Sequence, residues 1–530
     1  MAAVWKAFEF LDEDAPDPVG HRLIDAHMVF DVKADFTRKA RLVAGGHLTD
    51  PPSSITYASV VSRESVRIAF LLAALNDLDI LAADIGNAYL NARTREKIFI
   101  ICGREFGDSY VGRKALIVRA LYGLKSSGAA WRSCLAEVLR DQLGYQSCRA
   151  DGDVWFRASQ RPDGTRYYEY VLVYTDDILC LSCDPAATLC HLDQHFLIKP
   201  GSQGPPTFYL GATIGRYKFG DGDECWYMGS EQYIAEAVKN VTSWLEQRGL
   251  MLKTKVSSVL PSNYQPELDT TQLCDDEDTT YDQPQIGVLR WAVELGRIDI
   301  CTEVSILSGY MAAPRAGHLS ALMHVFAFMK SHKRSKVVLD PGYVDHVEQE
   351  KPDWSDFYAD AKELLPPDMP EPLGKPVQMT TFVDSDHAGD KVTRRSRTGI
   401  LVFLNRAPIV WISKKQNSIE TSTFGSEFMA MKHGVEVSEG IRYKLRMMGV
   451  PLDGPTIVKA DNMSVVKNTS LPESVLKKKS NSIAYHYVRE RAASGAIMVS
   501  YESTETNLAD MLTKVQPGPT RHRLVAKVLF

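Results

Sequence analysis

Long hydrophobic runs are missing from this sequence, and cysteine is scarce. The longest stretch of uncharged apolar residues, 68–75, is far too short to cross a lipid bilayer. The first residues lack the basic and then apolar pattern of a secretory signal peptide. The nine cysteines show no disulfide-like spacing, which is typical of a reducing compartment. We therefore expect neither a membrane span nor a secreted fold stabilised by disulfides.

A strong excess of charge is missing as well. The formal net charge is −5 at pH 7, so any affinity for nucleic acid has to come from local basic patches. Apolar residues make up 45% and charged residues 24% of the chain, as in ordinary globular proteins. No internal repeat is visible, and 530 residues are enough for about three domains.

The most distinctive stretch is YVLVYTDDILCLS at 170–182. Its β-branched, aliphatic and aromatic residues predict two strands, and the intervening pair Asp176 and Asp177 predicts a hairpin tip. Two adjacent carboxylates repel each other, so one tends to take up a proton unless a cation binds. Magnesium prefers such oxygen ligands. Taken alone, the pattern leaves a metal site and an ordinary surface turn equally open.

Further acids stand at the ends of predicted strands or in the first turns of predicted helices. Asp84 follows the short apolar strand 80–83. Four more acids belong to the strand and helix pattern after residue 379: Asp384, Glu427, Asp461 and Asp510. Single acids near helix N-termini are normally partners of the helix dipole. Phosphodiester chemistry, however, uses two cations held by carboxylates, and each half of the chain supplies the minimum set.

Two other patterns are weaker. In RKARLV, Lys39 and Arg41 alternate with apolar residues and therefore share one face of a predicted strand. Alone, this favours a solvated face over a grip on phosphates. Cys180 and Cys183 form a CxxC with histidines nearby, but Cys180 falls within the strand after the aspartate pair. A zinc site there stays open as the less favoured alternative.

Composition and periodicity divide the chain into five parts. We expect an α+β region over 20–255, an acidic loop or linker over 256–285, a helical segment over 286–339, a Pro- and acid-rich linker over 340–376, and an α/β unit over 377–520. Helices are expected at 62–76, 126–143, 230–248 and 423–448. Thr506 is expected to cap a further helix that carries Asp510.

Ten stretches carry a resemblance to a known family. They are RKARLVAGG, ADIGNAYLNA, ALYGLKSSGAAW, YVLVYTDDIL, FVDSDHAGDKVTRRSRTG, WISKKQ, SEFMAM, VKADN, YHYVRE and NLADMLTK. In these stretches, which span most of 20–515, the chain resembles the reverse transcriptase and RNase H region of a copia-type LTR retrotransposon polyprotein. The resemblance implies a right-hand polymerase with fingers and an antiparallel palm sheet in 20–255 and a thumb or connection segment in 286–339. An RNase H-like domain with a mixed sheet is implied for 377–520.

The resemblance also implies roles for individual residues. The implied metal ligands of the polymerase are Asp84, Asp176 and Asp177, and those of the RNase H are Asp384, Glu427, Asp461 and Asp510. Nucleotide binding is implied for Lys39, Arg41, Tyr89 and Lys125. Among these, Tyr89 matches the aromatic residue that excludes the 2′-hydroxyl of a ribonucleotide. The implied cofactor is Mg²⁺ or Mn²⁺.

The function implied by the resemblance is that of an RNA-directed and DNA-directed DNA polymerase with ribonuclease H activity. The implied partners are an RNA template, a DNA primer, deoxynucleoside triphosphates and an RNA/DNA hybrid. No association with a membrane is implied. The implied location is intracellular, in cytoplasmic virus-like particles, with the nucleus as an alternative. Since no protease, integrase or capsid-like sequence is present, we expect a fragment of the usual polyprotein whose oligomeric state is open.

Some positions depart from the family pattern. After the lysine of LYGLK the family has a glutamine and a Pro-Arg pair, whereas residues 126–129 read SSGA. Before YHYVRE the family has Lys-His-Ile-Asp, whereas residues 479–482 read KSNS. These departures leave two alternatives open. One is a catalytically inactive remnant that only binds nucleic acid, and the other is a nuclease with a dead polymerase.

Overall fold

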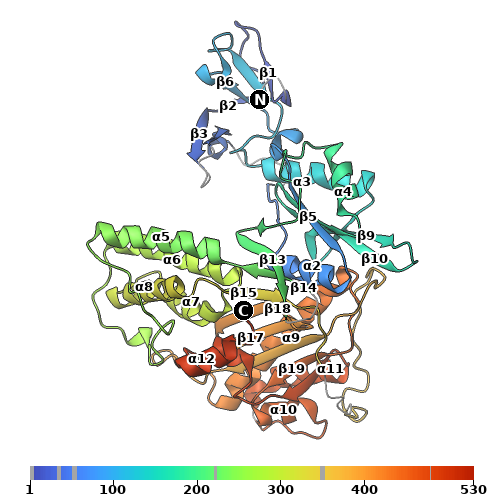
Figure 1. Ribbon diagram of the computed structural model, residues 1–530, viewed down its shortest axis with the longest axis vertical. Helices are drawn as coiled ribbons and strands as arrows, with labels where there is room; N and C mark the ends of the chain where they lie inside the picture. The colour runs from blue at the N-terminus through green and yellow to red at the C-terminus, as the bar shows by residue number, and fades with distance from the viewer. Residues whose placement is uncertain (1–4, 33–37, 50–55, 220–223, 346–351, 478) are drawn as a thin grey trace. The chain divides into compact units, whose positions relative to one another are not determined.

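The computed structural model describes residues 5–32, 38–49, 56–219, 224–345, 352–477 and 479–530 (Figure 1). The chain forms two compact units, and each is built from segments that are separated in sequence. Unit 1 is drawn from Met1–Ser62, Asp79–Gly164 and Tyr168–Pro205. Unit 2 is drawn from Arg63–Leu78, Thr165–Tyr167 and Pro206–Phe530. The predicted polymerase region, 20–255, is therefore divided between the two units.

The centre of unit 1 is a five-stranded sheet with the strand order β5-β11-β10-β9-β8. Its strands are β5 (Asp79–Asp84), β8 (Gln146–Cys148), β9 (Asp151–Gln160), β10 (Arg166–Tyr174) and β11 (Asp177–Ser182). The helices α3 (Ser127–Glu137) and α4 (Pro185–Asp193) accompany this sheet, and α3 continues into the π-helical turn η4 (Val138–Gln142). Trp131 and Leu135 of α3 pack in one buried cluster with Val171, Val173 and Ile178. The predicted antiparallel hairpin and the helix at 126–143 are confirmed.

The N-terminal part of unit 1 holds two smaller sheets. One has the order β1-β7-β6-β2. Its strands are β1 (Phe8–Phe10), β2 (Arg22–Leu23), β6 (Ile98–Ile101) and β7 (Lys114–Ile117). The other is the hairpin of β3 (Ala26–Val32) and β4 (Arg38–Ala44), which carries RKARLV. The Ala44 amide donates to the Tyr122 carbonyl (2.8 Å), and Leu42 and Ala44 pack in one buried cluster with Ile98 and Ile117.

Unit 2 begins with a four-stranded sheet and a group of helices. The strands are β12 (Phe208–Tyr209), β13 (Ala212–Lys218), β14 (Glu224–Gly229) and β15 (Lys336–Leu339). The helices are α2 (Arg63–Leu75), α5 (Glu231–Gln247), α6 (Asp276–Glu294), α7 (Cys301–Leu307) and α8 (Ala316–Ser331). The prediction of a loop over 256–285 is wrong from Asp276 onward, because the acidic run begins α6. Asp275 caps that helix by accepting from the Asp278 amide (2.8 Å), and the following acids face the positive end of the helix dipole.

The second sheet of unit 2 has the order β18-β17-β16-β19-β20. Its strands are β16 (Met379–Ser385), β17 (Arg397–Leu404), β18 (Ala407–Lys415), β19 (Thr456–Ala460) and β20 (Ile497–Tyr501). Strand β16 pairs antiparallel with β17 and parallel with β19, so the predicted mixed sheet is confirmed. The accompanying helices are α9 (Thr423–Met447), α10 (Met463–Ser470), α11 (Ser482–Ala493) and α12 (Gly518–Val525). The predicted fold class, an antiparallel palm-type sheet followed by a mixed sheet with helices, is confirmed.

Helix α9 approaches β16 very closely. An ideal Cβ built on Gly434 would lie 2.2 Å from Cγ1 of Val383, so only glycine fits where the helix crosses the strand. The prediction that Thr506 caps a helix is wrong. The cap is Asn507, whose side chain accepts from the Ala509 amide (3.1 Å) and begins the 3₁₀ helix η9 (Leu508–Leu512). Asn507 is preferred because its Nδ2 also donates to the Val383 carbonyl of β16 (3.0 Å).

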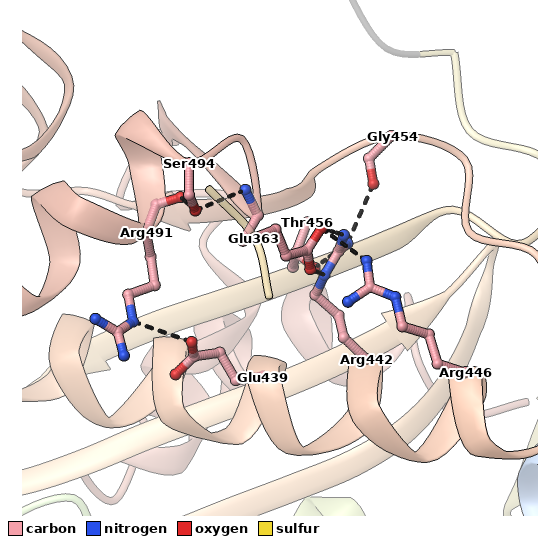
Figure 2. A network of polar contacts seen from close by, with 9 residues as sticks. Glu363, Glu439, Arg442, Arg446, Gly454, Thr456, Arg491 and Ser494 are labelled. Carbon is pink, nitrogen blue, oxygen red and sulfur yellow. Dashed lines mark hydrogen bonds and ion pairs between the residues drawn. The ribbon is translucent and has the colours of Figure 1, made fainter. Parts of the chain in front are cut away.

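Part of the predicted linker at 340–376 is anchored to α9, while residues 346–351 lie outside the described chain. Glu363 accepts hydrogen bonds from Nε and Nη2 of Arg442 (2.9 and 3.0 Å) and pairs with Nη2 of Arg446 (2.7 Å), as Figure 2 shows. A carboxylate held by two guanidinium groups is not a freely moving tether.

None of the described helices has the length and hydropathy needed to cross a membrane.

Candidate active sites

The first candidate site is the edge of the unit 1 sheet where β5 meets the β10–β11 hairpin. Asp177 is the direct partner of Asp84 in the antiparallel register of β11 and β5. Thr175 and Asp176 form the two-residue turn between the hairpin strands, and Thr175 has a positive φ of 60°, as such tight turns require. The Ile85 amide donates to the Asp176 carbonyl (2.9 Å). The fold thus brings Asp84 beside the pair Asp176 and Asp177, from which it is distant in sequence.

Burial and crowding change the acidity of the two aspartates at the hairpin tip. Burial, together with the charges of Asp176 and Asp84, raises the pKa of Asp177 to about 6. Burial and the charge of Asp84 also raise the pKa of Asp176. The site therefore has more negative charge than it can hold without a nearby cation.

Lys199 supplies a positive charge at this site. Its Nζ lies 2.5 Å from both carboxylate oxygens of Asp84. The Ser202 hydroxyl accepts from the Asp84 amide (3.1 Å) and so fixes the adjoining segment to β5. Sequence reasoning missed Lys199 and Ser202, because a lone lysine after a helix carries no local signal.

The predicted nucleotide-binding residues lie in unit 1, but not all of them are near the aspartates. Lys39 and Arg41 are half-buried on the same face of β4, while Arg38 and Ala40 are exposed, as the alternation predicts. Burial raises the pKa of Asp176, and the positive charge of Lys39 partly offsets this rise. Lys39 and Asp176 are therefore close enough to interact.

Tyr89 stands on the 3₁₀ helix η2 (Ala88–Asn91), directly after the strand that carries Asp84. Its ring centroid is 4.9 Å from that of Tyr122. Burial, followed by the effects of Tyr122 and Asp176, raises the pKa of the Tyr89 hydroxyl. Tyr89 is therefore an electrostatic neighbour of the aspartate turn, as its proposed role requires.

Lys125 is engaged elsewhere, since its Nζ donates to the Thr49 carbonyl. The neighbouring segment 126–129, which departs from the family pattern, is hydrogen-bonded to other parts of unit 1. Ser126 donates its backbone amide to Glu96 (3.1 Å), and the buried Ser127 hydroxyl donates to the Leu121 carbonyl (2.6 Å). The altered residues are thus accommodated by hydrogen bonds of their own.

The second candidate site lies at one end of the mixed sheet in unit 2. Single carboxylate oxygens of Asp384, Glu427 and Asp461 all lie within 4.8 Å of one another. Strands β16 and β19 run parallel with Phe382 opposite Lys459, so Asp384 and Asp461 emerge at the same edge. Glu427 reaches them from the beginning of α9, whose Ser422 cap accepts from the Gly425 amide (3.2 Å). Within the described residues this is the single group of three acids, histidines or cysteines with metal-ligand spacing.

Asp384 and Glu427 are more deeply buried than the carboxylates of unit 1, whereas Asp461 is only partly buried. Burial and then the charge of Asp384 raise the pKa of Glu427, and burial with the charges of Asp461 and Asp510 raises the pKa of Asp384. Asp510 lies beside the group but is held by other side chains. Its carboxylate pairs with Lys514 (2.6 Å) and accepts from Gln516 (2.7 Å).

Several groups that support the second site were not foreseen. The Thr513 hydroxyl donates to Asp384 (2.7 Å), and the Ser385 amide donates to Glu427. Lys514 stands four residues after Asp510 within NLADMLTK, so helical spacing could have pointed to it.

Cys180 is buried within β11. Among the described residues, neither Cys180 nor Cys183 belongs to a group with metal-ligand spacing. The zinc alternative therefore gains no support.

Both donor sets fit a hard divalent cation. Their ligands are carboxylate oxygens, and burial in a negatively charged neighbourhood penalises them until a cation compensates. The three acids of unit 2 already have chelating separations. In unit 1, Asp84, Asp176 and Asp177 do not form a group with that spacing, and Lys199 binds the Asp84 carboxylate instead.

Comparison with known proteins gives the first site a context. Residues 13–215 match the family model described as reverse transcriptase (RNA-dependent DNA polymerase). This segment is similar to that family. The match contains Asp84, Asp176 and Asp177, so the first site lies entirely within the matched segment.

Longer relatives extend the similarity beyond that segment. The chain is 26% identical over 485 residues to the retrovirus-related Pol polyprotein from transposon RE1 of Arabidopsis thaliana, covering 90% of this chain and 29% of the relative. It is 23% identical over 523 residues to the Pol polyprotein from transposon TNT 1-94 of Nicotiana tabacum, covering 94% of this chain and 35% of the relative. The predicted resemblance to copia-type retrotransposon polyproteins is confirmed. The chain spans about a third of the length of these relatives.

One solved structure is similar over most of the chain. It is the foamy viral protease-reverse transcriptase in complex with double-stranded DNA. The similarity has a TM-score of 0.49 and 12% sequence identity, and it covers 95% of this chain and 68% of the other.

Proposed function

We propose that the chain is an RNA-directed and DNA-directed DNA polymerase with an attached ribonuclease H, from a copia-type retrotransposon polyprotein. The observation that carries this proposal is the position of Asp84 directly opposite Asp177 within a segment similar to the reverse transcriptase family. Its partners are an RNA template, a DNA primer, deoxynucleoside triphosphates and the resulting RNA/DNA hybrid. The proposed location is intracellular, in cytoplasmic particles or the nucleus.

In the polymerase centre, Asp84, Asp176 and Asp177 would hold Mg²⁺ or Mn²⁺. The cations supply a lower pKa for the primer 3′-hydroxyl and balance the charge of the pyrophosphate leaving group. When a divalent cation compensates the charge of the Asp84 carboxylate, the Lys199 ammonium releases that carboxylate, which then binds the cation.

The nucleotide is bound by residues around this turn. Lys39 and Arg41 bind the triphosphate through charge-assisted hydrogen bonds from one face of β4. The Tyr89 ring excludes a 2′-hydroxyl and so selects deoxynucleotides. Lys125 stays in the proposed binding set, and it has to release the Thr49 carbonyl in order to reach a phosphate.

In the ribonuclease centre, Asp384, Glu427 and Asp461 would hold the divalent cations, with Asp510 at the rim. The cations supply a hydroxide at neutral pH and stabilise the leaving 3′-oxygen of the cut RNA strand. Thr513 and the Ser385 amide orient the Asp384 and Glu427 carboxylates for this task. Within this proposal, 20–255 is the polymerase region, 286–339 the thumb or connection segment, and 377–520 the ribonuclease H-like domain.

The test is a pair of assays on the full chain with Mg²⁺ or Mn²⁺. The protein should extend a DNA primer on an RNA template and cut the RNA of a separate hybrid. Asp176→Asn should abolish extension and keep cleavage, whereas Asp79→Asn, at the far end of strand β5, should keep both. Equal extension by wild type and Asp176→Asn would contradict the polymerase assignment. Salt-dependent binding without either activity would identify an inactive remnant, and cleavage alone would identify a nuclease.

A further inference from the structure

We propose that Gln416 is a positioning residue of the second site, whose side-chain amide holds Asp384 and Glu427 at the separation that a divalent cation requires. This inference rests on the proposed metal centre but assigns a role to a residue outside the carboxylate set. Gln416 directly follows β18 and is only 3% exposed.

The Gln416 side chain joins three elements. Its Nε2 donates to the Thr398 hydroxyl on β17 (3.0 Å) and to the Ser426 carbonyl of α9 (3.0 Å), and it is 3.5 Å from the Ser385 hydroxyl on β16. The Gln416 backbone amide donates to the Ser396 carbonyl (2.7 Å), which fixes the base of the side chain. The amide therefore lies between the strand and the helix that carry the site.

The partners of the amide are neighbours of the metal-ligand candidates. Ser385 follows Asp384, and Ser426 precedes Glu427. The Ser385 amide also donates to the Glu427 carboxylate, so the two segments are linked on both sides of the site. A change at Gln416 would alter the Asp384–Glu427 separation without touching either carboxylate. Groups that hydrogen-bond metal ligands directly typically change metal affinity 10- to 100-fold, and Gln416 acts on the residues next to the ligands.

The orientation of the amide is determined by its environment. A carbonyl oxygen can only accept, so the nitrogen of Gln416 has to face Ser426. The Oε1 oxygen then faces away, is buried, and makes no hydrogen bond with any residue in the described part of the chain. An unpaired buried oxygen costs about 1–3 kcal/mol. A residue selected only for stability would not leave a buried oxygen unpaired. The need for a hydrogen-bond donor to Ser426 and Thr398 explains why an amide is present despite that cost.

The experiment measures Mn²⁺ binding to the full chain by electron paramagnetic resonance. An Asp176→Asn, Asp177→Asn background removes the polymerase centre, so that the titration reports the second site. Gln416→Met keeps the length of the side chain and removes the amide. We expect it to weaken Mn²⁺ binding at least tenfold. Gln378→Leu is the matched control, because Gln378 is hydrogen-bonded at the opposite end of β16, and we expect it to change Mn²⁺ affinity less than twofold.

Cleavage of an RNA/DNA hybrid gives a second readout. Gln416→Met should raise the Mg²⁺ concentration for half-maximal cleavage about tenfold and leave the rate at saturating Mg²⁺ within threefold. A merely structural role would lower the rate equally at all Mg²⁺ concentrations.

The outcomes separate this inference from the proposed function. Unchanged Mn²⁺ affinity in folded Gln416→Met would overturn the inference and leave the function standing. Absence of Mn²⁺ binding in the parental background, which lacks the polymerase centre, would overturn the inference and the ribonuclease part of the proposed function. If Gln416→Met does not fold, Thr398→Val decides, because it removes one partner of the amide and keeps Gln416. A threefold or greater loss of affinity supports the inference, and an unchanged affinity overturns it.

Discussion

Asp84 and Asp177 face each other across the antiparallel strands β5 and β11, and the Lys199 ammonium binds the Asp84 carboxylate at 2.5 Å. The lysine supplies positive charge beside the aspartates, and in the proposed polymerase centre it would compete there with a divalent cation. The electrostatic balance at this turn leads to the first two predictions.

Lys199→Met should increase the affinity of the polymerase centre for Mn²⁺ about threefold, because it removes a competing cation. The pair is partly exposed, so the expected gain is only about 0.7 kcal/mol. Electron paramagnetic resonance in an Asp384→Asn background, which disables the second centre, measures this change. Lys239→Met serves as the control, because Lys239 is an exposed lysine on α5 that pairs with Glu236. A weaker affinity in Lys199→Met would show that the lysine supports the site instead of competing.

Asp177→Asn should stabilise the metal-free protein at neutral pH. The pKa of Asp177 is raised to about 6, so folding favours its protonated form. This contribution is complete below the ordinary pKa of an aspartate and is lost as the pH rises through about 6. The variant should therefore gain on the order of 1 kcal/mol above pH 6, allowing for partial exposure, and nothing at pH 4. Thermal unfolding between pH 4 and 8 in EDTA measures it, and an equal gain at both ends would refute the cause.

Glu363→Gln should loosen the segment that is anchored on α9 (Figure 2). Burial opposes ionisation of Glu363, but hydrogen bonds from Arg446 and Arg442 outweigh it and lower the pKa to about 2. The carboxylate therefore stabilises the fold above the ordinary pKa of a glutamate, and this contribution is lost as the pH falls through about 2. We expect a loss of about 2 kcal/mol at pH 7, measured by urea unfolding. Glu490, which forms a surface ion pair with Arg491, provides the control. Glu490→Gln should change the free energy of unfolding by less than about 0.5 kcal/mol.

Tyr89→Ala should admit ribonucleotides to the polymerase centre. The ring lies beside Tyr122 and close to Asp176, where it would meet the sugar of the incoming nucleotide. Loss of the ring should lower the preference for dNTP over rNTP at least tenfold, or about 1.4 kcal/mol, in single-nucleotide extension. Tyr89→Phe retains the ring and should retain the preference. A similar loss in both variants would assign the discrimination to the hydroxyl.

Local patterns predicted those parts of the sites that depend on neighbours in sequence. The aspartate hairpin, the strand end at Asp84 and the long helix with Glu427 each follow from periodicity and turn chemistry. Lys199 could not be found in this way, because it meets Asp84 across 115 residues and has no motif of its own. The acidic run at 275–278 was misread for a different reason, since acids that suit a linker also suit the first turn of a helix.

The path of the chain through α2 has a practical consequence. This helix is inserted between two segments of unit 1 yet belongs to unit 2, where Arg67 stacks on Trp411 (3.8 Å) and donates to the Ile409 carbonyl (2.7 Å). Glu64 of α2 forms an ion pair with Lys444 of α9, which is a further contact within unit 2. No single cut can therefore release the part with the mixed sheet intact. A protein expressed from residue 377 onward would expose the indole of Trp411 to water and would tend to aggregate through the uncovered β18.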